Sequence, residues 1–272
     1  MLISEGNRPH QNLGKDLIYQ ARAEGVRRLL AFAPCGAGKS RVMRQLALEE
    51  VARGGSVRLY LHRSLLLQQM IQNFTDDGIE FGIQAAGYPV NEDARIQLCM
   101  ADSVYARAVR GSKWGLGEPT LVMFDEAHNQ TGNKARSIVF GGQTSLGATW
   151  RGHYDTGAFV LGFTATPVEM GDMYERLVSF ANYREMRDCK AHLPVRVYGP
   201  SEIDTKGVGV QKNGDFNAAQ LDERTYCIIG DVYEYWKIYN PEAKPAILFA
   251  PSVDSSKWFA SEFCRRGGRS RI

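Results

Sequence analysis

Short apolar runs alternate with amphipathic stretches along most of this 272-residue chain, and this alternation restricts the fold more than any other feature. Each apolar run has the length of a buried strand. The pattern predicts helices over residues 12–25, 39–55 and 64–74, and strands over residues 27–33, 56–62, 81–86, 96–100, 120–125 and 158–163. Strands that alternate with helices indicate an α/β fold, with a mostly parallel sheet and helices on both faces.

The segment APCGAGKS, residues 33–40, follows the first predicted strand and precedes a predicted helix. A glycine-rich turn in this position gathers backbone N–H groups at the positive end of the helix dipole, which suits a polyphosphate. Lys39 can then reach the β- and γ-phosphates, and the Ser40 hydroxyl can ligate Mg²⁺. We therefore predict a nucleotide-phosphate site formed by Pro34, Cys35, Gly36, Ala37, Gly38, Lys39 and Ser40.

The alternative is a turn that only joins a strand to a helix. Ala33 stands where the general pattern GxxxxGK[ST] has its first glycine, so the strict pattern fails at one residue. The order of strand, turn, GKS and helix favours the phosphate site over this alternative.

Asp125 and Glu126 come directly after the apolar residues 121–124. At the carboxyl edge of a parallel sheet, both carboxylates are expected beside the phosphate-binding turn. Asp125 is expected to hold Mg²⁺ through water, and Glu126 to polarise the attacking water as a general base. His128 is a candidate for coupling this site to another part of the molecule. The alternative is a helix N-terminus, where the helix dipole favours acidic side chains.

Composition adds limits on the partners and the setting. The chain is 44% hydrophobic and 23% charged, which is ample for a packed core, and its net charge of +3 permits a polyanionic partner without demanding one. The five cysteines are scattered, with no CxxC pair and no zinc-like spacing. They predict reduced thiols in an intracellular, cytoplasmic protein. No stretch approaches the length of a membrane span, so no membrane partner is expected.

Taken in order, these segments resemble the motifs of superfamily 2 helicases and translocases. APCGAGKS resembles motif I, in which an alanine at the position of Ala33 is usual. DEAH (125–128) resembles motif II, and GFTATP (162–167) resembles motif III. RPHQ (8–11) resembles the family element that recognises adenine, and residues 60–69 resemble motif Ia. Residues 98–107 stand where the family has its next segment that contacts nucleic acid, and residues 246–263 resemble motif IV. The pattern is most similar to that of phage helicases and restriction-enzyme motors.

The resemblance implies a RecA-like domain that binds ATP and Mg²⁺. It implies that Gln11 hydrogen-bonds the adenine and that Arg8 supports it. It also implies that the hydroxyls of Thr164 and Thr166 link the Mg²⁺ site to the nucleic-acid surface. The alternatives are a polar pair before a helix for the first two residues, and a strand end closed by Pro167 for the last two.

Arg63, Ser64 and Ser103 are the residues that the resemblance assigns to nucleic-acid phosphates, contacts that position a strand without reading its sequence. Helix capping is the alternative. Ser64 is a plausible N-cap for the helix that follows it, and Asp102 with Ser103 is favoured as the cap of the next helix. DNA is favoured over RNA as the partner.

The resemblance divides the chain into a RecA-like ATP-binding domain (1–200), a connector with a helix (201–244) and the start of a second RecA-like domain (245–272). The connector helix is predicted over residues 218–239, and KPAILFA begins a new strand–turn–helix unit. Motifs V and VI, which include the arginine finger, are expected downstream of Ile272. We therefore expect a second RecA-like half or a partner to supply this arginine.

The predicted function is nucleic-acid-dependent hydrolysis of Mg-ATP, coupled to translocation or unwinding. Two alternatives stay open. One is a module that binds ATP and nucleic acid with little turnover, because motifs V and VI are absent. The other is a P-loop kinase or transferase, which would need a small-molecule acceptor site and a lid that carries an arginine.

Overall fold

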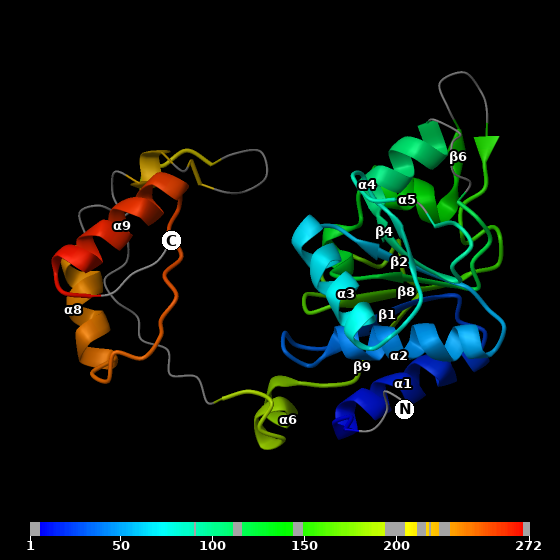
Figure 1. Cartoon of the computed structure of the whole chain (residues 1–272), viewed down its shortest axis with the longest axis horizontal. Helices are drawn as coiled ribbons and strands as arrows, with labels where there is room; N and C mark the ends of the chain where they lie inside the picture. The colour runs from blue at the N-terminus through cyan, green and yellow to red at the C-terminus, as the bar shows by residue number, and fades with distance from the viewer. Residues whose placement is uncertain are drawn as a thin grey trace. The chain divides into compact units, whose positions relative to one another are not determined.

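The computed structural model describes residues 6–89, 91–110, 116–143, 149–193, 205–210, 216–217, 219–222 and 229–268. The chain forms two compact units, Met1–Pro194 and Val195–Ile272 (Figure 1). Every site residue predicted from the sequence lies in the first unit.

Seven strands form the main sheet of the first unit, in the order β3-β4-β2-β5-β8-β1-β9, and all of its neighbouring strands are parallel. Their bounds are Arg28–Phe32 (β1), Val57–Leu61 (β2), Gly82–Gln84 (β3), Ile96–Met100 (β4), Leu121–Phe124 (β5), Phe159–Thr164 (β8) and Arg176–Ser179 (β9). The predicted parallel α/β fold is confirmed. The sequence did not predict β9, because its four residues RLVS are largely exposed and contain no apolar run.

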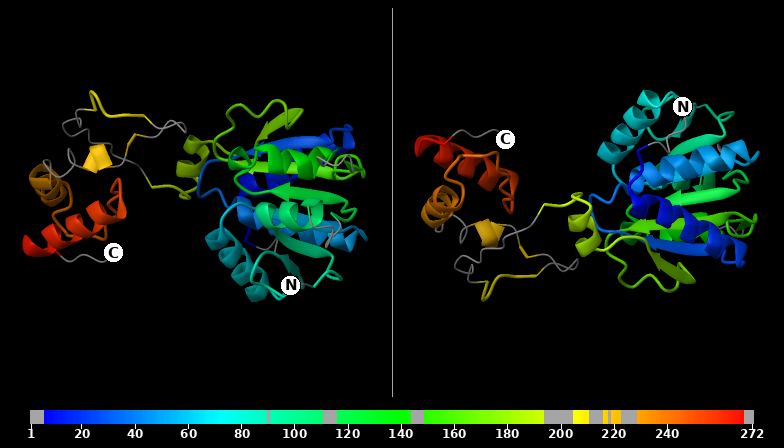
Figure 2. Two further views of the ribbon diagram at one scale, coloured as in Figure 1. Left: turned by 90° about the horizontal axis from the view of Figure 1, so that it is seen from above. Right: turned by 90° about the horizontal axis from the view of Figure 1, so that it is seen from below.

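Helices cover both faces of this sheet. One face packs against α1 (Pro9–Ala23), α2 (Lys39–Ala52) and α3 (Ser64–Asp76). The other face packs against α4 (Ala101–Val104), which continues into a π-helical turn (η1, Tyr105–Arg110), and α5 (Asn133–Phe140). Seen from below in Figure 2, the blue helices α1 and α2 lie in front of the sheet. A short antiparallel pair, β6 (Gly142–Gln143) and β7 (Thr149–Trp150), lies outside the main sheet.

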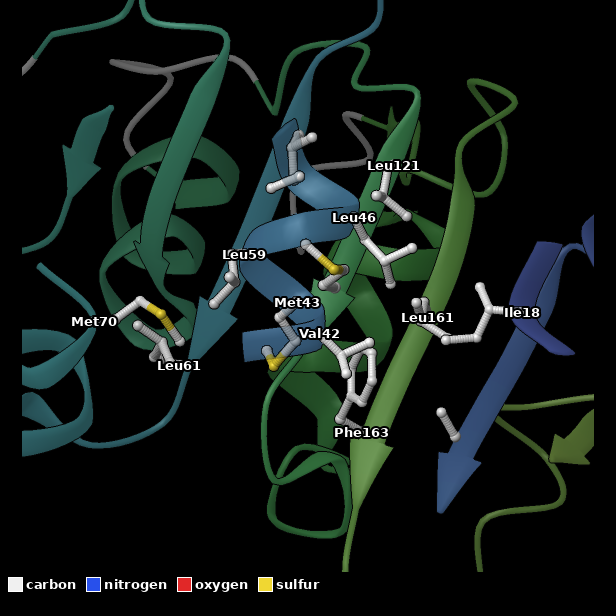
Figure 3. Close-up of a cluster of buried hydrophobic side chains, with 14 of the residues drawn as sticks. Ile18, Val42, Met43, Leu46, Leu59, Leu61, Met70, Leu121, Leu161 and Phe163 are labelled. Atoms are coloured by element: carbon white, nitrogen blue, oxygen red, sulfur yellow. The ribbon is translucent and has the colours of Figure 1, made fainter. Parts of the chain in front are cut away.

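The central strands are mostly apolar because both of their faces are buried. In β5, Leu121 and Met123 point to the core beneath α1, α2 and α3, while Val122 and Phe124 point to the opposite core. Figure 3 shows the first of these cores, in which Val42, Met43 and Leu46 of α2 pack beside Leu161 and Phe163 of β8 (Figure 3). This packing fixes the start of α2, and therefore the phosphate-binding turn, against the sheet.

The second unit contains α8 (Ile229–Tyr239) and α9 (Val253–Arg265), which pack through aromatic rings. The rings of Tyr233 and Phe263 meet edge to face with centroids 5.2 Å apart. Residues 219–222 are also helical, and residues 223–228 of the predicted connector helix lie outside the described residues. Among the helices that the structure describes, none is both long and apolar enough to cross a membrane.

The strand predicted at the start of KPAILFA is wrong. Residues 243–250 form no strand, and the side chains of Ile247 and Phe249 are 84% and 91% exposed. A strand is stabilised by pairing with a neighbouring strand. In the described part of the second unit, the only pairing of this kind is one isolated bridge between Val210 and Phe216. The helix that follows, α9, is present as predicted.

Candidate nucleotide-binding site

The loop predicted to bind phosphate, called the phosphate loop below, runs from Ala33 to Gly38, between β1 and α2. Two of its glycines have left-handed backbone, with φ of 76° at Gly36 and 81° at Gly38. A Cβ atom would lie 2.9 Å from Nε2 of His192 at the first position, and 2.2 Å from Nε2 of Gln11 at the second. Both positions therefore favour glycine, for backbone conformation and for space.

Some backbone N–H groups of this loop are available to an anion, whereas that of Ala37 donates to the carbonyl oxygen of Pro34. In the part of the chain that the structure describes, neither Gly36 nor Gly38 has an acceptor for its backbone N–H. The first N–H groups of α2 have no partner within the helix, as at any helix start, and the helix dipole is positive there. Such a set of unpaired donors favours a bound polyphosphate.

Lys39 lies against the base of this loop. Its side chain is buried, and its Nζ donates to the carbonyl oxygens of Ala33 (3.2 Å) and Pro34 (3.4 Å). An ammonium group has three donors, so one remains for a further acceptor. Its positive charge also acts on Asp125, where it partly offsets the burial that raises the pKa of that carboxyl. Lys39 is therefore placed between the phosphate loop and the acidic turn.

Two side chains from the start of α1 hold the far end of the loop. His10 and Gln11 are buried, and their Nε2 atoms lie 3.0 Å and 3.1 Å from the carbonyl oxygen of Ala37. The amide oxygen of Gln11 accepts a hydrogen bond from the backbone N–H of Arg8 (3.0 Å). His10 was not predicted as a site residue, although it directly precedes Gln11. The adenine contacts of Gln11 and Arg8 stay a prediction.

Asp125 follows β5 and is buried, with 6% of its surface exposed. Its Oδ1 accepts a hydrogen bond from the backbone N–H of Glu126 (3.0 Å). Burial, together with the charge of Glu126, raises the pKa of Asp125 to about 6, against the opposing effects of that N–H group and of Lys39. A buried carboxylate whose charge is disfavoured in this way is well suited to a nearby cation.

The turn after Asp125 has a strained backbone. Glu126 has φ of 46°, in the left-handed region that non-glycine residues rarely adopt, and a 3-10 helix (η2, Ala127–Asn129) follows. Gln130 holds this turn, because its Nε2 donates to the carbonyl oxygens of Asp125 (2.6 Å) and Tyr60 (3.2 Å). Gln130 was not predicted from the sequence, because its contact with Tyr60 spans 70 positions.

His128 joins this acidic turn to the end of β8. Its Nδ1 lies 3.0 Å from Oγ1 of Thr164 and 3.6 Å from Oε2 of Glu126. The same Thr164 oxygen accepts a hydrogen bond from the backbone N–H of Thr166 (2.9 Å). The structure therefore brings together the three residues that the sequence analysis assigned to coupling.

The first unit matches a known protein family. The family of the type III restriction enzyme res subunit matches residues 6–169, which contain the phosphate loop, the acidic turn and the end of β8. This chain belongs to that family. The match and the parallel sheet together identify the first unit of this res-subunit family member as a superfamily 2 helicase-like RecA domain.

A phage protein is similar to this res-subunit family member over most of the chain. The "51.5 kDa protein" of a Lactococcus phage (isolate 7-9) is 28% identical over 243 residues, which are 86% of this chain and 46% of the relative. The chain thus spans less than half of the length of the curated relative it matches.

Solved structures with a similar fold include helicases and a restriction enzyme. The UvsW helicase from bacteriophage T4 has a TM-score of 0.46 and 18% identity, covering 64% of this chain and 60% of that protein. The ATP-dependent Type ISP restriction-modification enzyme LlaBIII, bound to DNA, has a TM-score of 0.49 and 17% identity, covering 66% of this chain and 16% of that one. The Pyrococcus furiosus Hef helicase domain has a TM-score of 0.46 and 16% identity, covering 93% of this chain and 56% of that one.

In this member of the res-subunit family, the residues predicted to contact nucleic acid lie at the same sheet edge as the phosphate loop. Arg63 and Ser64 follow β2 and are exposed. Ser103 follows β4, which pairs with β2 in parallel, so both strands end at the carboxyl edge. Their contacts with phosphates stay a prediction.

The helix caps predicted for this edge are wrong. Ser64 is the first residue of α3 rather than its N-cap, a position that Arg63 occupies. The N-cap of α4 is Met100, because β4 runs directly into this helix and leaves no loop for a capping side chain. Ser103 instead accepts a hydrogen bond from the backbone N–H of Ala86 (3.2 Å), and Asp102 pairs with Lys134 (2.7 Å).

The residues of this res-subunit family site fit ATP and Mg²⁺. The unpaired N–H groups of Gly36 and Gly38 suit phosphate oxygens. In the described part of the chain, no group of three or more His, Cys, Asp or Glu side chains could hold a metal by itself. Mg²⁺ at nucleotide sites needs only one or two protein oxygens together with phosphates and water. Ser40 and Asp125 stay the residues predicted to supply these oxygens.

Proposed function

We propose that this chain is a nucleic-acid-dependent ATPase of helicase or translocase type, with DNA favoured over RNA. The observation that carries the proposal is the meeting of two features at one sheet edge. The predicted phosphate loop has unpaired backbone donors, and the charge of Lys39 at its end acts on the carboxylate of Asp125. Glu126 directly follows Asp125 in the chain. Membership of a restriction-enzyme family supports DNA as the polymer.

Each residue of the site has a separate task in this proposal. Lys39 and the loop N–H groups bind the β- and γ-phosphates, Ser40 ligates Mg²⁺, and Asp125 holds it through water. Bound Mg²⁺ neutralises charge that develops on the phosphates during transfer. Glu126 accepts a proton from the water that attacks the γ-phosphate. The left-handed backbone at Glu126 and the support from Gln130 keep the acidic turn in one conformation.

Hydrolysis is coupled to nucleic acid along the same edge. The hydrogen bond between His128 and Thr164 links the turn that carries Glu126 to the end of β8, and Thr166 lies in the loop that follows this strand. We assign Arg63, Ser64 and Ser103 to phosphates of the polymer. An arginine finger comes from a second RecA-like half or from a partner. The four described cysteines are free thiols, which supports an intracellular setting.

Two variants test the chemistry. Calorimetric titration with Mg-ATP and a phosphate-release assay are applied to the wild type, Lys39→Ala and Glu126→Gln. We expect Lys39→Ala to lose nucleotide binding, and Glu126→Gln to bind Mg-ATP but release no phosphate. The matched controls Lys257→Ala and Glu118→Gln change exposed side chains and should behave as the wild type. Turnover by Glu126→Gln at the rate of the wild type would contradict the role of the general base.

A further inference from the structure

His192 lies against the phosphate loop, although 157 positions separate it from Cys35 in the sequence. Its Nε2 lies 2.5 Å from the carbonyl oxygen of Cys35. The ring also lies over the next residue, because a Cβ atom added to Gly36 would be 2.9 Å from the same nitrogen. The imidazole therefore packs on two consecutive residues of the loop that cradles phosphate.

Backbone hydrogen bonds to helix α6 hold the residue that carries this ring. The backbone N–H groups of Ala191 and His192 donate to the carbonyl oxygen of Met186 (2.8 Å and 2.9 Å). Met186 belongs to α6 (Tyr183–Asp188), and its side chain is fully buried in the core of the first unit. Helix α6 itself begins at an N-cap, Asn182, which accepts a hydrogen bond from the backbone N–H of Glu185 (3.0 Å). His192 thus ties the loop to an anchored segment.

The segment 189–193 is also the last described part of the first unit, because Val195 begins the second unit only three residues after His192. A change in the conformation of Cys35 and Gly36 reaches this segment through a single hydrogen bond. We propose that His192 is a positioning residue, which holds the phosphate loop in its binding conformation and couples nucleotide binding to residues 189–193. The inference rests on the proposed function in so far as the loop binds ATP.

The hydrogen bond from His192 to Cys35 is expected to increase the affinity for nucleotide. The ring donates to a carbonyl, so it holds the peptide between Cys35 and Gly36 in one orientation. Without this bond the peptide is free to rotate, and its N–H is no longer held in place for a phosphate oxygen. A single hydrogen bond of this kind is worth about a three- to tenfold change in affinity. His192 touches none of the reacting atoms, so the rate at saturating ATP should change little.

The first measurement is the affinity for Mg-ATP, together with KM and kcat, for His192→Ala and His192→Gln. We expect the alanine variant to raise Kd and KM by about three- to tenfold with kcat nearly unchanged. The glutamine variant keeps a side-chain N–H donor and should recover most of the affinity. Leu193→Ala changes the exposed neighbouring residue and serves as the matched control. Thermal melting of each variant verifies that the fold is retained.

The second measurement separates coupling from a merely structural role. Hydrogen–deuterium exchange of residues 183–193 is followed with and without Mg-ADP. We expect nucleotide to change the exchange of this segment in the wild type and in His192→Gln, but not in His192→Ala. An alanine variant with the affinity and the exchange response of the wild type would overturn the inference and leave the proposed function intact. A wild type that binds no nucleotide would overturn both.

Discussion

The Nδ1 atom of His128 lies 3.0 Å from Oγ1 of Thr164, so one hydrogen bond joins the acidic turn after β5 to the end of β8. Thr164 is fully buried, and its hydroxyl also accepts a hydrogen bond from the backbone N–H of Thr166. A change at the acidic turn therefore has a direct route to the loop that follows β8.

We expect Thr164→Val to uncouple this route, because valine keeps the shape of the side chain and removes its oxygen. Binding of Mg-ATP should persist, while the stimulation of hydrolysis by nucleic acid falls by about three- to tenfold, as expected for the loss of one hydrogen bond. Phosphate release with and without single-stranded DNA measures the effect. Thr166→Val tests the second hydroxyl separately, because it leaves the contact between His128 and Thr164 intact. Full stimulation in Thr164→Val would contradict the coupling role.

We expect Asp125→Asn to make the folded protein more stable at pH 8 while it loses Mg-ATP hydrolysis. The folded-state pKa of about 6 lies above the ordinary value of 3.8, so this carboxylate contributes stability only at low pH, and that contribution is lost as the pH rises through 6. A shift of this size corresponds to a gain of at most about 3 kcal/mol on removing the charge.

Urea unfolding in EDTA at pH 8 measures this gain in the free energy of unfolding. Glu118→Gln removes an exposed carboxylate and should leave the stability unchanged. An Asp125→Asn variant that is less stable than the wild type would show that the ionised carboxylate contributes net stability.

Local patterns were sufficient to predict the central strands and the two turns that carry the site. An apolar run that stops at a glycine-rich turn or at paired acids predicts a buried strand that ends at the carboxyl edge of a parallel sheet. The loop at Gly36 and the turn at Asp125 could be located from sequence for this reason, as could the α/β fold itself.

The remaining contacts depend on the packing of distant segments. His192 reaches Cys35, and Gln130 reaches the backbone of Tyr60, across sequence separations that leave no local pattern. Capping was wrong at Ser64 because the helix starts one residue earlier than the cap requires. The strand predicted near Phe249 failed for a related reason, since an apolar run becomes a strand only where another strand pairs with it.

We expect the buried histidine His153 to make stability fall below about pH 6.5. Its side chain is fully buried, and its Nε2 lies 2.8 Å from the hydroxyl oxygen of Tyr60. Burial, with a smaller effect of Arg58, lowers the pKa of His153 to about 3 from an ordinary 6.5. The unfolded chain therefore binds one more proton between these values, which costs about 1.4 kcal/mol of stability for each pH unit below 6.5.

His153→Gln tests this contribution, because glutamine offers Tyr60 a polar partner that does not titrate. Urea unfolding between pH 7 and pH 4.5 should give a flatter pH profile for the variant than for the wild type. The raised pKa of Asp125 acts with the opposite sign in part of this range, but it is common to both proteins and cancels in their difference. Parallel profiles would show that His153 does not control this dependence.

We expect Tyr174→Phe to stabilise the first unit by about 1 kcal/mol, because a buried hydroxyl without a partner carries a desolvation penalty. The Tyr174 side chain is 4% exposed, and its hydroxyl has no hydrogen-bond partner in the part of the chain that the structure describes. The same hydroxyl would lie 2.5 Å from a Cβ at Gly162, so Gly162→Ala should destabilise the unit by about 1–3 kcal/mol. Chemical denaturation measures both changes, and a loss of stability in Tyr174→Phe would show that the hydroxyl contributes net stability.

The most direct test of the central claim is the rate of phosphate release from Mg-ATP by the purified chain, alone and with single-stranded DNA, duplex DNA, or RNA. We expect one form of DNA to increase the rate severalfold, and the increase to vanish in Lys39→Ala and Glu126→Gln. Nucleotide binding without turnover on any polymer, or turnover that no polymer changes, would contradict the account of a nucleic-acid-dependent motor.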